Sequence, residues 1–161
     1  MTEESSRAPG SSLVTLAMLV LLVAIAAAGY YWSPLLLPKA DLTAKPPEGC
    51  DLQRQACAAV LPDGARIELS IVPRPIPILT PLRVEVVLTG IEGRKVEVDF
   101  AGETMNMGYN RTMLAASGSG RHLGEASLPV CVSGGMNWVV TVQVETGRQR
   151  IAVPYRVAVG F

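Results

Sequence analysis

Side chains that bind soft metal ions are concentrated in one stretch of the sequence, residues 98–138. Besides Met1 and Met18, every methionine lies in it, together with the single histidine, His122, and one of three cysteines, Cys131. Thioether, thiolate and imidazole groups together suit Cu(I) better than other common biological metals. We therefore predict that a copper ion, Cu(I), is bound by Met105, Met107, His122, Cys131 and Met136.

The spacing of these residues favours a site formed by loops. Met105 and Met107 are two residues apart, so in extended chain their side chains point the same way. Cys131 and Met136 flank a Ser-Gly-Gly turn, and a hairpin there would bring them within reach of each other. His122 begins the segment that leads to Cys131. If that segment neighbours the Met105 loop, the ligands converge.

Each of these residues also has an ordinary structural explanation. A methionine in a β domain usually fills the core, and a free cysteine is usually a small buried apolar side chain. His122 fits equally well on the surface of a strand. Two alternatives are therefore open, and they differ in whether Met105, Met107 and Met136 converge at the surface or point into the core.

Catalytic motifs are not evident, and we do not expect an enzyme. A blue-copper centre needs two histidines, and the chain has one. No G-x-S-x-G sequence precedes a helix, no Gly-rich phosphate loop opens one, and Cys131 has only His122 as an activating base. The formal net charge is zero and the basic residues are scattered, which argues against binding to nucleic acid.

Residues 13–32 form an uncharged apolar run that ends in Tyr-Tyr-Trp. Twenty helical residues rise about 30 Å, which matches a bilayer core, and the aromatic residues would lie at its interface. An alanine triplet within the run would also suit signal-peptide cleavage, but the run is longer than an ordinary signal-peptide core. We expect an uncleaved single-pass anchor, preceded by a disordered cytoplasmic tail over residues 1–12.

Residues 33–48 contain four prolines, which predicts a semi-rigid spacer before a folded domain over residues 49–161. Cys50 and Cys57 are predicted to form a local disulfide, with a metal pair as the less favoured alternative because no histidine accompanies them. A disulfide requires an oxidising compartment. We therefore expect a protein of the bacterial inner membrane, with its N-terminus in the cytoplasm and its C-terminal domain in the periplasm.

Alternating apolar and polar residues dominate the remainder and predict an all-β domain. Seven segments carry the strands, and turn residues separate them. About seven short strands in roughly 110 residues suggest an immunoglobulin-like β-sandwich preceded by one transmembrane helix. The strands are expected within residues 66–71, 83–88, 95–100, 112–116, 122–129, 137–144 and 151–159.

An anchor, a Pro-rich spacer and the segments GETMNMGYNR and LPVCVSGGMNWVVTVQV resemble the FixH/YtkA-like group of bacterial exported domains. The resemblance covers residues 64–159 and places Met105, Met107, Met136 and Trp138 at positions typical of the group. It implies a periplasmic role linked to copper or to a respiratory oxidase, without any reaction. The three cysteines lie outside the pattern.

Two functions of different classes follow from these features. The leading one is a membrane-anchored periplasmic domain that binds Cu(I) or assists assembly of a copper-containing respiratory oxidase. The alternative is a metal-free structural or interaction domain that docks on a membrane protein complex.

Overall fold

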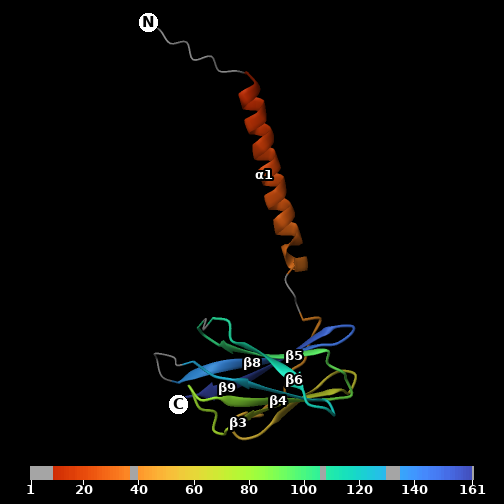
Figure 1. The fold of residues 1–161 in the computed structure, drawn as a ribbon, viewed down its shortest axis with the longest axis vertical. Helices are drawn as coiled ribbons and strands as arrows, with labels where there is room; N and C mark the ends of the chain where they lie inside the picture. Colours follow the sequence, from red (N-terminus) through yellow and green to blue (C-terminus); the bar gives the residue numbers. More distant parts are fainter. Residues whose placement is uncertain (1–8, 37–39, 106–107, 130–134, 161) are drawn as a thin grey trace. The chain divides into compact units, whose positions relative to one another are not determined.

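The computed structural model describes residues 9–36, 40–105, 108–129 and 135–160. The chain divides into two compact units, residues 1–39 and 40–161, and each is described by itself (Figure 1).

One helix, α1 (Pro9–Leu36), forms the described part of the first unit. Its stretch Ser12–Trp32 has a mean hydropathy of 2.5. The side chains of residues 12–32 are exposed, and Pro9 occupies the first helical position, where its missing N–H costs no hydrogen bond. The helix is long and apolar enough to cross a membrane, as predicted for residues 13–32.

The second unit is a single nine-stranded sheet with the order β1-β9-β8-β5-β6-β7-β4-β3-β2. All neighbours are antiparallel except β1 and β9, which are parallel. The strands are β1 (Leu42–Thr43), β2 (Cys57–Val60), β3 (Arg66–Val72), β4 (Leu82–Thr89), β5 (Lys95–Gly102), β6 (Arg111–Ala116), β7 (Arg121–Ala126), β8 (Met136–Glu145) and β9 (Arg150–Val159).

The sheet curls into a half-barrel around one apolar core (Figure 1). It is continuous because β6 pairs with β5 through Leu114 and with β7 through Ala115. The largest fully buried side chains include Trp138, Tyr155 and Phe100. The all-β class and the seven predicted strands are confirmed, but the sheet has nine strands. The two that were missed, β1 and β2, are too short to show alternation.

The folded unit begins earlier than the predicted Gly49. The Asp41 N–H donates to the Arg150 carbonyl at 2.8 Å, and the Ala44 N–H donates to the Ala152 carbonyl at 3.0 Å. The end of the predicted spacer is therefore part of the sheet, as β1. This pairing joins residues more than a hundred positions apart, so the local sequence pattern does not reveal it.

The strand register defines two ends of the domain. The chain enters the sheet beside Arg150, and we call this the entry end; Thr89 and Arg121 also lie there. The opposite end, which we call the distal end, carries the last residue of β5, Gly102, and the first residue of β8, Met136. The connection between β3 and β4, residues 73–81, also lies at the distal end.

Candidate functional site

Two of the predicted metal ligands, Met105 and Met136, lie close together at the distal end. The Glu103 N–H donates to the Asn137 carbonyl at 2.9 Å, which brings the loop after β5 beside the start of β8. A Cβ atom on Gly102 would lie 3.2 Å from the Met136 sulfur and would clash with the Met105 carbonyl oxygen. Only glycine therefore fits between the two methionines.

These two methionines differ in their exposure. The Met105 side chain is 47% exposed, whereas Met136 is 6% exposed and belongs to the core. Met136 thus fills the core, as the structural alternative predicted for the methionines. Of these two methionines, Met105 is the one that solvent can reach.

His122 lies at the entry end, away from Met136. It is opposite Val86 in β4 and Ala116 in β6, and it is 7% exposed, with Nδ1 3.3 Å from the Gly120 carbonyl oxygen. Leu114, two residues before Ala116 in β6, is level with Val144 in β8. Val144 and Met136 are eight positions apart along β8, or about 26 Å. The structure therefore does not bring His122 to Met136, and His122 is not a surface residue.

Met107 and Cys131, the other two predicted ligands, lie outside the described residues. Among the residues that are described, no group of three or more histidine, cysteine and acidic side chains is placed to hold a metal ion.

The predicted disulfide joins Cys50 and Cys57, with 5.8 Å between their Cα atoms. Cys57 is the first residue of β2 and is fully buried, whereas Cys50 is half-buried. The metal-pair alternative for these two residues does not apply while they are joined.

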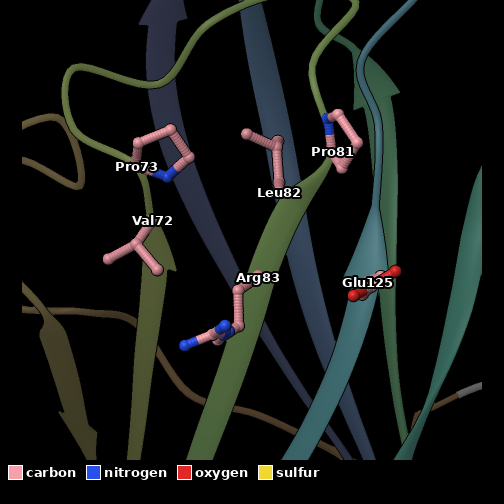
Figure 2. A pocket seen from close by; sticks show the side chains of 6 residues that line it. All are labelled: Val72, Pro73, Pro81, Leu82, Arg83 and Glu125. Carbon is pink, nitrogen blue, oxygen red and sulfur yellow. The ribbon is translucent and has the colours of Figure 1, made fainter.

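A groove of about 400 Å³ lies on the distal part of β3, β4 and β7 (Figure 2). Val72, Arg83 and Glu125 stand opposite one another on these three strands, and all three are exposed. The remaining lining residues are Pro73, Pro81 and Leu82. The side chains of Arg83 and Glu125 form no ion pair or hydrogen bond with any described residue, so both charges are free to meet a ligand.

Exposed apolar side chains gather on two loops at the same end. Leu79 is 69% exposed and Tyr109 is 81% exposed. The Leu79 N–H donates to the Leu128 carbonyl at 3.0 Å, and the Asn110 side-chain amide donates to the neighbouring Ser127 carbonyl at 3.1 Å. Residues 127–128 therefore hold the two loops side by side.

Leu79 also has an unusual backbone conformation, with a φ of 55°. A non-glycine residue in this left-handed region costs about 1–2 kcal/mol. The hydrogen bond from its N–H to the Leu128 carbonyl holds this conformation.

The charged groups around these loops are mostly paired. Arg156 donates to Glu103 at 2.8 Å, and Arg111 lies 3.5 Å from Asp99 while its guanidinium stacks 5.4 Å from the Tyr109 ring centre. The distal end therefore carries exposed apolar side chains, which we call the apolar tip: Ile78, Leu79, Met105 and Tyr109. The charges around the tip are paired, whereas the groove carries two charged side chains, Arg83 and Glu125, without an ionic partner among the described residues.

Sequence reasoning missed the groove and the apolar tip. The groove residues come from three strands that are distant in the sequence, so no local motif marks them. The tip had a weak signal, since Ile78 and Leu79 are consecutive apolar residues in a proline-rich connection. Comparisons with protein-family models and with curated proteins found no match.

Proposed function

We propose that this chain is a membrane-anchored interaction domain without catalytic activity, which docks on a membrane protein complex through its distal end. The observation that carries the proposal is Leu79, an apolar side chain exposed on a strained backbone. Strain of this kind persists only where the surrounding structure imposes it, and it is concentrated at sites of function.

The proposed location rests on α1 and on the disulfide. A 21-residue apolar stretch supplies an anchor of the right length, and Cys50–Cys57 suits an oxidising compartment. We place the N-terminus in the cytoplasm and the sheet domain in the periplasm of a bacterial inner membrane. Within this proposal, the half-barrel is a variant of the immunoglobulin-like sandwich in which β6 joins the two halves.

The docking surface consists of the apolar tip (Ile78, Leu79, Met105 and Tyr109) and the groove beside it. Exposed apolar groups gathered at one end of a domain mark interaction sites. Aromatic and apolar anchors supply most of the binding energy of an interface, and a polar rim supplies its orientation. The side chains of Arg83 and Glu125, which have no ionic partner within the described part of the chain, suit that rim.

Site-specific photocrosslinking in the native membrane tests this proposal. A benzophenone amino acid would replace Leu79 or Tyr109 in one set of variants and Arg148, which is exposed at the entry end, in the control. We expect both distal positions to crosslink the same integral membrane protein and the control position to leave it uncrosslinked. Equal crosslinking from all three positions, or none from the distal ones, would refute docking through this end.

A second candidate is the binding of Cu(I) in support of a copper-containing respiratory oxidase. The position of Gly102 favours it, because the Met105 backbone and the Met136 sulfur both lie against this glycine, and thioethers are ligands that suit Cu(I). Anaerobic titration of the full chain in detergent with Cu(I), against a competing chelator, tests this candidate. Stoichiometric binding supports it, and no binding rejects it.

A further inference from the structure

A single connection joins the two edge strands of the sheet, β1 and β2. β1 and β2 follow each other in the chain, yet they lie at opposite edges of the nine-stranded sheet. The connection between them, residues 44–56, must therefore cross the open side of the half-barrel. We call this connection the strap.

The strap is fastened to both sides of that opening. The Gln53 side-chain oxygen accepts the Ile76 N–H at 2.6 Å, and its amide nitrogen donates to the Ala158 carbonyl in β9. Leu52, the residue before it, is fully buried in the core. The middle of the strap thus binds β9 on one side and the connection between β3 and β4 on the other.

The disulfide controls how long the strap is. Cys50 and Cys57 are seven positions apart, but their Cα atoms are only 5.8 Å apart. Seven residues of extended chain span up to about 23 Å. The disulfide, together with three hydrogen bonds that Asp51 accepts, therefore holds residues 51–56 in a compact turn that places Leu52 and Gln53. Without the disulfide, the strap could lengthen.

We propose that the strap is a redox-controlled latch, closed when Cys50 and Cys57 are oxidised and open when they are reduced. A dithiol of the thiol–disulfide oxidoreductase class supplies the two electrons. Its thiolate attacks the half-buried Cys50 sulfur, and the Cys50–Cys57 bond breaks. Cys57 leaves as a thiolate and takes up a proton. The second thiol of the reductant then displaces Cys50, which is also protonated, and the reductant becomes a disulfide.

Opening the latch uncovers defined groups. The Ala158 carbonyl and the Ile76 N–H lose their partner, Gln53. β1 covers β9 only at Ile151 and Ala152, so the outer edge of β9 near Ala158 becomes free for strand pairing. The rest of the sheet keeps its ladders, because the strap contributes no strand between β9 and β3.

Hydrogen exchange of the full chain in lipid nanodiscs tests the latch, with and without dithiothreitol as the reductant. A Cys131→Ser background prevents thiol reshuffling. Peptides covering residues 73–77 report on Ile76, since three of these five residues are proline and the other amide is that of Arg74. We expect reduction to speed exchange at Ile76 at least tenfold, with exchange in β5 and β8 unchanged. Unchanged exchange at Ile76, or equal loss of protection in all strands, would overturn the proposal.

A variant that keeps the disulfide separates the latch from a simple loss of stability. Gln53→Ala removes both strap contacts, so Ile76 should exchange quickly even when oxidised, and reduction should add less than twofold. Gln55→Ala is the matched control, because Gln55 lies in the same turn and its side-chain amide donates to the Cys50 sulfur, at 3.9 Å, and not to β9 or to Ile76. If Gln53→Ala behaves like Gln55→Ala, the strap is not held by Gln53 and the latch is refuted.

Discussion

The hydroxyl of Tyr155 in β9 donates a hydrogen bond to the carbonyl oxygen of Ile67 in β3, at 3.1 Å, within the core. These strands are six positions apart in the order of the sheet, so the bond joins its two halves directly. Burial raises the pKa of Tyr155 above its usual value, and the nearby charge of Glu68 raises it further. This phenol therefore remains protonated in the folded domain at a pH where a free tyrosine ionises.

We predict that the domain loses stability in alkali through Tyr155. An unfolded tyrosine has a pKa of about 10. Because the folded pKa is higher, the contribution of Tyr155 is fully present below about pH 10 and is lost as the pH rises above it, by up to about 1.4 kcal/mol per pH unit. Denaturant unfolding at several pH values measures this slope. Tyr155→Phe should reduce it, and should cost about 1 kcal/mol at neutral pH for the lost bond.

Tyr109→Phe is the control for the alkaline prediction, since Tyr109 is exposed and lies outside the core. It should keep the slope of the native chain. If both variants lose stability in alkali equally, Tyr155 is not its cause.

Gly118 and Gly120 provide a matched test of the turn between β6 and β7. Both have a left-handed φ, 82° and 74°, but a Cβ on Gly118 meets open space, whereas one on Gly120 would overlap the Leu88 carbonyl oxygen. We expect Gly118→Ala to cost about 1 kcal/mol of unfolding free energy, and Gly120→Ala to cost at least about 1 kcal/mol more. Equal losses in thermal or denaturant unfolding would contradict the close contact with Leu88.

The strand pattern and the apolar helix were predictable because both depend on local periodicity. In β4, for example, Val84, Val86 and Leu88 are buried while the residues between them are exposed or half-buried. The disulfide was predictable for a similar reason, since Cys50 and Cys57 are close in the sequence.

The relative positions of the candidate ligands depend on strand order, which local periodicity does not contain. His122 and Met136 are fourteen positions apart in the sequence, yet they belong to β7 and β8, which are not neighbours in the sheet. His122 lies near the start of β7 at the entry end, whereas Met136 starts β8 at the distal end. The start of the domain was misplaced for the same reason, because β1 pairs with β9 from the far end of the chain.

Leu52 should contribute strongly to stability. It is fully buried although it lies in a connection and not in a strand. Leu52→Ala is expected to lower the free energy of unfolding by about 2–5 kcal/mol, as is usual for a buried leucine. Leu79→Ala, at an exposed site, should change it by less than about 0.5 kcal/mol. Similar small losses in denaturant unfolding for both variants would mean that the strap does not seal the core.

The position of Gly102 yields the last prediction, which concerns copper. If Cu(I) binds at the distal end, Met105→Leu removes the exposed thioether and should weaken binding at least tenfold in a chelator competition. His122→Gln should leave the affinity unchanged, because His122 lies at the entry end and about 26 Å of strand separates its level from Met136. Thermal unfolding of each variant checks that the fold is retained. A loss of affinity in His122→Gln with Met105→Leu unaffected would place the copper site at the entry end and reject the distal methionines as ligands.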